Sequence, residues 1–145
     1  MKRIAALISC AVLMTSVAGC QRSAEAPMDL SGRWDVQEIA GASLGEGVDI
    51  WMEVDAETGA ITGFTGCNNF SAHLSSFGER LAIGDVVEET GDCPTEAAAT
   101  DEARFLVVLP RVERRIRRGA SLELLPIASG SETLLKLRLD EPLGG

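Results

Sequence analysis

Hydrophobic and polar residues alternate most regularly in VDIWMEV, residues 48–54. The first, third, fifth and seventh residues of this segment are apolar, and the polar residues lie between them together with Trp51. A period of two is typical of a β-strand with one buried face. Trp51, on the opposite face, is either an exposed contact residue or part of a second buried layer. AETG then supplies turn residues, and AITGFTG begins a second strand, so residues 48–66 are predicted to form a hairpin.

Shorter stretches of the same alternation follow along the chain. The glycine-rich residues 41–47 are predicted to be a loop, and Asn68 and Asn69 are predicted to form a corner, because both tolerate left-handed backbone. Further strands are predicted in SGRWDVQEI (31–39), FSAHLS (70–75), LAIGDVV (81–87), RVERRIR (111–117), SLELLPI (121–127) and TLLKLRL (133–139).

One segment has the composition of a helix. PTEAAATDEARFLVVL, residues 94–109, combines good helix formers with early acidic residues and an apolar cluster near its end. Thr95 or Thr100 is predicted to cap this helix, and Pro110 to end it. The predicted fold class is therefore α+β: mostly antiparallel β, as a curved sheet or an incomplete barrel, with one packed helix.

The N-terminal residues are typical of a secretory signal peptide. Lys2 and Arg3 precede an apolar stretch that ends in small residues. The alternative, a membrane-spanning helix, is disfavoured because residues 4–19 fall short of the roughly 20 residues that a bilayer core requires. Val-Ala-Gly-Cys at residues 17–20 resembles the lipobox of bacterial lipoproteins. We therefore predict a signal peptide at 1–19, a lipidated N-terminus and tether at 20–29, a domain at 30–140 and a short tail at 141–145.

This resemblance implies that Cys20 is acylated and becomes the first residue of the mature protein. Fatty acyl chains such as palmitate contribute roughly 0.8 kcal/mol per buried CH₂, so two or more chains hold a protein stably on a membrane. In similar lipoproteins an aspartate after the cysteine favours retention in the inner membrane, and this chain has Gln21 instead. The predicted location is the outer membrane, with the protein anchored by lipid and facing the periplasm.

The charge of the chain excludes one class of partner. Removing residues 1–19 removes Lys2, Arg3 and no acidic residue, which changes the net charge from −9 to −11. Nucleic acid is therefore not expected to bind. The length fits a single domain with a real core. Nothing in the sequence indicates a cofactor.

The cysteines divide into two groups. Cys10 leaves with the signal peptide and Cys20 carries the lipid, so Cys67 and Cys93 are left in an exported domain. A disulfide between them is predicted, with a reduced, buried thiol pair as the alternative. Zinc needs two more ligands, and the chain offers one histidine, His73, and no second cysteine pair, so no metal site is predicted.

Several short motifs together resemble the META domain of the heat-shock lipoprotein HslJ family. They are L-x-G-x-W near the start, G-x-x-G-C-N at the end of the hairpin, C-P after the fourth strand, and E-x-x-F-x-x-x-L in the helix. The resemblance implies small exported proteins with antiparallel β-structure and a helix, links to heat or antibiotic stress, and no established catalytic activity. The motif residues are Trp34, Gly63, Gly66, Cys67, Asn68, Cys93, Pro94, Glu102 and Phe105.

Other candidate sites have simpler alternatives. A basic cluster between residues 111 and 118 is a candidate contact for an anionic surface, and a solvated strand edge is the alternative. The acidic pairs Glu88-Glu89 and Asp101-Glu102 are explained by turns and the helix dipole. No catalytic residue is predicted, because His73 has no nucleophile motif around it. The arginines of the basic cluster are Arg111, Arg114, Arg115, Arg117 and Arg118.

These observations lead to one expected function and one alternative. The expected function is a non-enzymatic, lipid-anchored envelope protein whose META-like domain binds an envelope component in a stress-related role. The alternative is a pilotin-like carrier that holds an acyl chain or a hydrophobic peptide, and it requires a continuous apolar cavity beneath the sheet.

Overall fold

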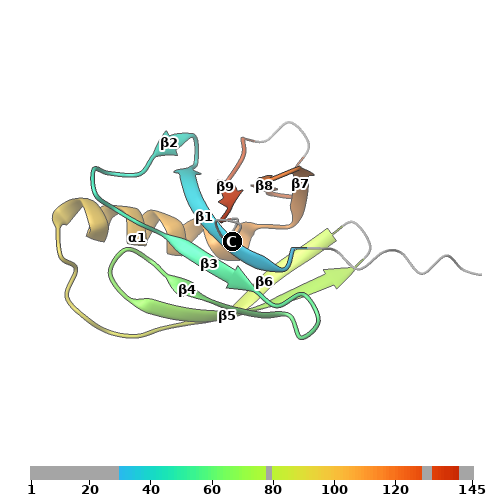
Figure 1. Cartoon of the computed structure of the whole chain (residues 1–145), viewed down its shortest axis with the longest axis horizontal. Helices are drawn as coiled ribbons and strands as arrows, with labels where there is room; N and C mark the ends of the chain where they lie inside the picture. The colour runs from blue at the N-terminus through green and yellow to red at the C-terminus, as the bar shows by residue number, and fades with distance from the viewer. Residues whose placement is uncertain (1–29, 78–79, 129–131, 141–145) are drawn as a thin grey trace, which may run out of the picture.

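The computed structural model describes residues 30–77, 80–128 and 132–140, which form a strongly curved sheet around one helix (Figure 1). The helices are α1 (Glu96–Val108) and the short 3₁₀ helix η1 (Leu109–Arg111). The strands are β1 (Gly32–Ile39), β2 (Ala42–Ser43), β3 (Trp51–Val54), β4 (Ala60–Phe64), β5 (Asn69–Phe77), β6 (Arg80–Glu88), β7 (Arg114–Arg118), β8 (Ser121–Leu125) and β9 (Leu135–Leu139).

The sheet closes into a ring of antiparallel strands. Its order is β2-β1-β3-β4-β5-β6-β7-β8-β9, and β9 also pairs with β1. The shortest strand pairing is the one between β6 and β7. In the described part of the chain, a single residue pair, Arg80 with Arg114, joins these two strands. This arrangement confirms the prediction of a mostly antiparallel, curved sheet with one helix.

The alternating residues fill the inside of the ring. Met52 and Val54 of β3 are buried between neighbours that are exposed or half-buried, and the same alternation recurs in β8 and β9. Trp34 of β1 is fully buried, and its indole N–H donates to the carbonyl oxygen of Leu30 at 2.8 Å. Because a buried indole N–H needs an acceptor, this bond lets the largest side chain of the core be buried without an orphaned donor.

The first hairpins differ in detail from the predicted ones. β3 begins at Trp51 rather than at residue 48, because the N–H of Val48 bonds back to the carbonyl oxygen of Gly45 at 3.1 Å and closes a turn. The predicted loop at 41–47 contains the short strand β2. Ala40 and Gly41 both have positive φ, which suits the tight turn that returns β2 along β1.

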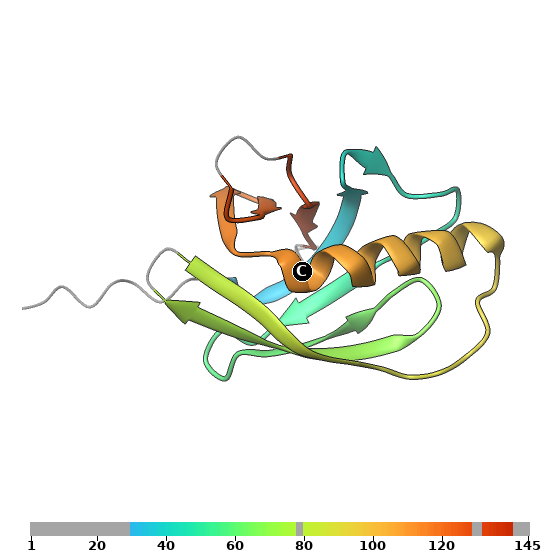
Figure 2. The ribbon, with the colours of Figure 1, turned by 180° about the vertical axis from the view of Figure 1, so that it is seen from behind.

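Helix α1 runs across the ring (Figure 2). Thr95 caps it by accepting a hydrogen bond from the N–H of Ala98 at 3.0 Å, and Pro110 lies in η1 directly after it, as predicted. Asp101 is 3% exposed and accepts from the N–H of Gly45 at 2.6 Å. Arg104 bonds both Asp101 and the carbonyl oxygen of Ile39. The prediction that Asp101 serves the helix dipole is therefore wrong: this acid ties α1 to β1 and its following loop.

Candidate functional site

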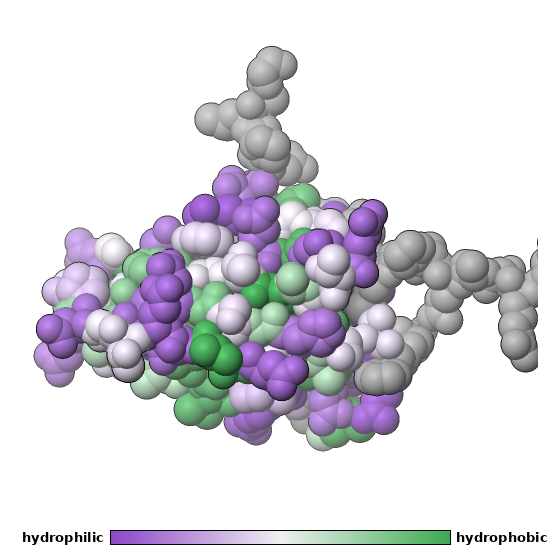
Figure 3. Space-filling view, turned by 90° about the horizontal axis from the view of Figure 1, so that it is seen from below, coloured by the Kyte–Doolittle hydropathy of each residue, from purple (hydrophilic) through white to green (hydrophobic). Residues whose placement is uncertain are grey.

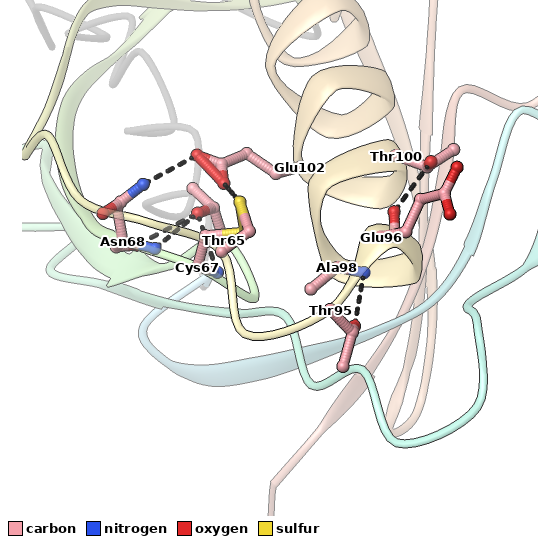
Figure 4. The surroundings of a disulfide bond; sticks show 9 residues. Thr65, Cys67, Asn68, Thr95, Glu96, Ala98, Thr100 and Glu102 are labelled. Carbon is pink, nitrogen blue, oxygen red and sulfur yellow. Dashed lines mark hydrogen bonds between the residues drawn. A yellow bond between two sulfur atoms is a disulfide. The ribbon is translucent and has the colours of Figure 1, made fainter.

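Most of the family-motif residues meet at the corner between β4 and β5. Cys67, in that corner, forms a disulfide with Cys93, which lies in the segment leading to α1. Asn68 of the corner donates from Nδ2 to a carboxylate oxygen of Glu102 on α1 at 3.0 Å (Figure 4). The corner is thus joined to the helix by one covalent bond and one hydrogen bond. The predicted disulfide is confirmed, and the reduced thiol pair is not what the structure shows.

The backbone of the corner is held by Thr65, which is fully buried. Its N–H donates to the carbonyl oxygen of Asn68 at 2.9 Å, and its hydroxyl accepts from the N–H of Asn68 at 3.0 Å. Gly66 has a φ of +96°, which an L side chain rarely adopts. GFTGCNNF therefore encodes a tight turn that presents Cys67 and Asn68 to the helix.

Glu88, at the end of β6, faces Glu102 from the other side of this corner. Glu88 is opposite Phe70 in the β5–β6 ladder and, like the buried Phe70, points toward α1. The hydrogen bond with Glu102, then desolvation and the charge of Glu102, raise the pKa of Glu88 to about 7, while Asn68 lowers it. The pair holds a proton at a pH where an ordinary glutamate has lost it. Glu88 and Glu102 are therefore not merely turn and dipole residues, as predicted, but a carboxyl pair beside the disulfide.

This pair makes stability depend on pH. The pKa of Glu88 is about 7 in the folded protein against an ordinary value of 4.5, so the folded state binds this proton more tightly than the unfolded state does. The contribution of this proton to the free energy of unfolding is fully present below pH 4.5 and is lost as the pH rises through 7. We expect its loss to cost on the order of 1 kcal/mol, because Glu88 is only partly buried and solvent screens its charge.

Urea unfolding between pH 4 and 9 measures this effect. Subtracting the curve for Glu88→Gln from the wild-type curve isolates the contribution of Glu88, which should decline with rising pH. The matched control is Glu89→Gln, because Glu89 is exposed and bonds the side chain of Asn69. A wild-type profile that Glu88→Gln leaves unchanged would contradict the prediction.

An open groove of about 440 Å³ lies on the outer face of the sheet, over β3 to β6. Thr62, Ser71 and Val87 are neighbours across three strands and are all exposed, which places their side chains outside the ring. Seen from below in Figure 3, hydrophobic residues gather in the middle of this side of the molecule, among hydrophilic ones. The groove is lined by Trp51, Thr62, Gly63, Asn69, Phe70, Ser71, Val87, Glu88 and Glu89.

Trp51 supplies a broad apolar surface in this groove. Its ring is half-buried on the outer face, and the guanidinium carbon of Arg33 lies 4.2 Å from the ring centroid. This places Trp51 in an outer contact surface rather than in a second closed core. Val87 is 64% exposed and adds a second apolar side chain to the groove. Glu89 adds an exposed acidic group, so the groove combines apolar side chains with negative charge.

The motif glycine Gly63 shapes the groove from below. A Cβ at this position would lie 2.6 Å from a ring carbon of Phe70 and still closer to the carbonyl oxygen of Trp51. Glycine is therefore required for Phe70 to pack across β4 onto Phe105, whose ring centroid is 5.4 Å away. The outer groove and the disulfide corner therefore lie on opposite faces of the same group of packed residues.

Comparison with known proteins agrees with these motifs. A family model described as the META domain matches residues 27–140 of the chain. The chain belongs to the META domain family. No curated protein matches the sequence.

Two solved structures share the fold of this META domain. An NMR structure of a protein from Burkholderia xenovorans superposes with a TM-score of 0.61 at 17% identity, covering 77% of this chain and 83% of that one. A second NMR structure gives a TM-score of 0.56 at 16% identity, covering 74% of this chain and 88% of that one. At these identities the likeness concerns the fold alone.

The candidate arginines of this META domain do not share one surface. Arg115 and Arg117 lie opposite Leu124 and Leu122, whose side chains are buried, so both arginines are on the inner side of β7. Arg117 lies over the ring of Trp34, with 5.2 Å between its guanidinium carbon and the ring centroid. Burial and then the charge of Arg117 lower the pKa of Arg115. The other three arginines of the cluster do not lie on this inner side; they are Arg111, Arg114 and Arg118. Contact of these three with an anionic surface remains a prediction.

Other predicted residues lie outside the groove and the corner. His73 is exposed on β5, Pro94 is exposed after Cys93, and Trp34 belongs to the core. Cys20, the signal peptide, the tether and the tail fall outside the described residues. Among the described residues, no helix combines the length and apolar character needed to cross a membrane. The groove and the role of Glu88 were not predictable from the sequence, because both depend on which strands become neighbours.

Proposed function

We propose that this META domain is the binding part of a non-enzymatic, lipid-anchored envelope protein, and that the outer groove holds an apolar segment of another envelope protein next to a basic residue. The observation that carries the proposal is that Trp51, Val87 and the exposed carboxylate of Glu89 line one groove. Its volume is within the range of ordinary ligand sites. The net charge of −9 for the whole chain favours a basic partner.

The carrier alternative has less support. The apolar cavity inside the ring, lined by Leu30, Met52 and Leu122 among others, has a volume of about 10 Å³. That is about the space of one water molecule, and an acyl chain needs much more. The outer groove is open and partly acidic, which suits a peptide side chain better than a lipid tail.

Synthetic peptides test the groove directly. We would titrate the protein with decapeptides in which an apolar tripeptide is flanked by lysine, glutamine or glutamate. Binding is followed by the change in tryptophan fluorescence, which we expect to come from Trp51 in the groove rather than from Trp34 in the core. The lysine-flanked peptide is expected to bind most tightly, and added salt should weaken it. Val87→Asp should lower its affinity at least about tenfold, which corresponds to about 1.4 kcal/mol.

A matched variant separates binding from general damage. Val107 is 62% exposed on α1 and is not part of the groove, so Val107→Asp should bind the lysine-flanked peptide like the wild type. Equal binding of all three peptides, or equal loss in both variants, would refute the groove as the binding surface.

The proposed anchoring, outer-membrane location and stress role rest on the lipobox-like residues 17–20, on Gln21 and on the family. Mass spectrometry of the protein extracted from membranes tests the first of these. The expected N-terminal fragment begins at Cys20 and carries the mass of its acyl chains. An unprocessed chain recovered from the soluble fraction would contradict the proposed location.

A further inference from the structure

The disulfide corner brings together sulfur and carboxylate ligands from different parts of the chain. The Sγ atoms of Cys67 and Cys93 and a carboxylate oxygen of Glu102 all lie within 4.8 Å of one another. Glu88, at the end of β6, lies opposite Phe70 and on the same face of the sheet, the face that packs against α1, which carries Glu102. Four elements therefore meet at one point: the β4–β5 corner, the segment before α1, α1 itself and the end of β6.

The protein satisfies the carboxyl groups at this point only in part: Asn68 donates to one oxygen of Glu102 at 3.0 Å. Glu102 is 8% exposed, and one of its oxygens lies 3.2 Å from Cys93 Sγ. A disulfide sulfur carries no proton, so it donates no hydrogen bond to that oxygen. Within the described residues, no N–H or hydroxyl group donates to the buried Oε1 of Glu88. Two neighbouring carboxyl groups that are shielded from water are costly to ionise together, and a cation between them and the sulfurs would relieve that cost.

We propose that Cys67, Cys93 and Glu102 bind a thiophilic divalent cation such as Zn²⁺ when their disulfide is reduced, with Glu88 completing the site. A dithiol is the reductant: its thiolate attacks the disulfide, and its second thiol resolves the mixed disulfide. Two electrons and two protons pass to the protein, and the reductant leaves as its own disulfide. Metal binding then displaces the protons of both thiols.

The ligand types select the metal. Two thiolates with the carboxylates of Glu102 and Glu88 make a four-coordinate sulfur and oxygen set, which zinc accepts and which magnesium and calcium do not favour. This set of ligands was not evident from the sequence, because Glu88 and Glu102 lie 21 and 35 residues after Cys67. The asparagine bond to Glu102 orients one carboxylate of the site, as ligand-supporting hydrogen bonds do in metal centres.

A reductant and a metal have access to the site. Both cysteines are only half-buried, and Asp92 and Pro94, the neighbours of Cys93, are exposed. The two sulfurs must separate to bind one cation. The exposed residues 89–92 give Cys93 the freedom for that shift.

Cobalt titration tests the proposal. The full chain is reduced with a phosphine, freed of reductant under argon and titrated with Co²⁺, whose thiolate complexes absorb in the near ultraviolet. We expect one Co²⁺ per chain with this absorption, displacement by Zn²⁺, and release of protons measured in weak buffer. The oxidised protein should give no such absorption. Reduced protein that gives none, whether folded or not, would overturn the proposal.

Variants assign the ligands. Glu102→Gln is expected to weaken Co²⁺ binding at least about tenfold, and Glu88→Gln to weaken it less, since a neutral amide replaces a charged ligand. Glu96→Gln is the matched control, because Glu96 lies on the same helix as Glu102 but is exposed and outside both the corner and the groove. Circular dichroism of each reduced variant shows whether it is folded. Binding by Glu102→Gln as tight as by the control would exclude the carboxylate from the site.

Discussion

Replacing Phe105 with alanine is expected to lower the free energy of unfolding by about 3–5 kcal/mol. Phe105 is 0% exposed, and its ring meets that of Phe70 edge to face at 5.4 Å. Through this contact α1 supports the floor of the outer groove. The variant therefore leaves a cavity between helix and sheet that neither side can close by itself. Urea unfolding followed by circular dichroism measures the loss.

Val107→Ala is the control for this variant. Val107 lies two residues further along the same helix and is 62% exposed, so its truncation should change stability by less than about 0.5 kcal/mol. If the two variants unfold at the same urea concentration, Phe105 does not join the helix to the sheet in the way described.

Removing the disulfide is expected to cost about 3.5 kcal/mol in the chain-entropy model. Cys67 and Cys93 are 26 residues apart in sequence, so their bond restricts a large loop of the unfolded chain. The double replacement Cys67→Ser and Cys93→Ser should lower the urea midpoint accordingly. It should also weaken peptide binding in the groove, because the same bond holds the β4–β5 corner against α1.

Reduction of the wild-type protein gives an independent check. A dithiol added in the absence of metal should lower wild-type stability to about that of the double variant, and it should leave the double variant unchanged. Equal stability of the wild type and the double variant before reduction would show that the crosslink does not stabilise the fold.

The parts of the fold that were predictable from sequence are those determined locally. In VDIWMEV and TLLKLRL the alternation reports one buried face, and Met52, Val54, Leu135 and Leu137 are indeed buried. Thr95 is a good cap because its hydroxyl serves the first turn of its own helix. The disulfide was predictable as well, because a chain with two cysteines in its domain allows one pairing.

The candidate site was predictable only in part, because it depends on contacts between distant segments. The motif residues were recognised, but nothing local shows that Glu88 meets Glu102 across the ring. Arginines in a row suggest a single basic surface. A strand sends successive side chains to opposite sides, so Arg115 and Arg117 instead lie against buried leucines.

The pairing of β1 with β9 has a consequence for how the domain forms. These are the first and last strands of the described part of the domain, and Trp34 of β1 lies opposite Leu139 of β9. The ring therefore cannot close until the C-terminal strand has been synthesised and has returned to the start. Contacts this distant in sequence slow folding, and until they form, β1 has an open edge on which other chains can aggregate. A nascent chain of this kind benefits from a chaperone until its final strand arrives.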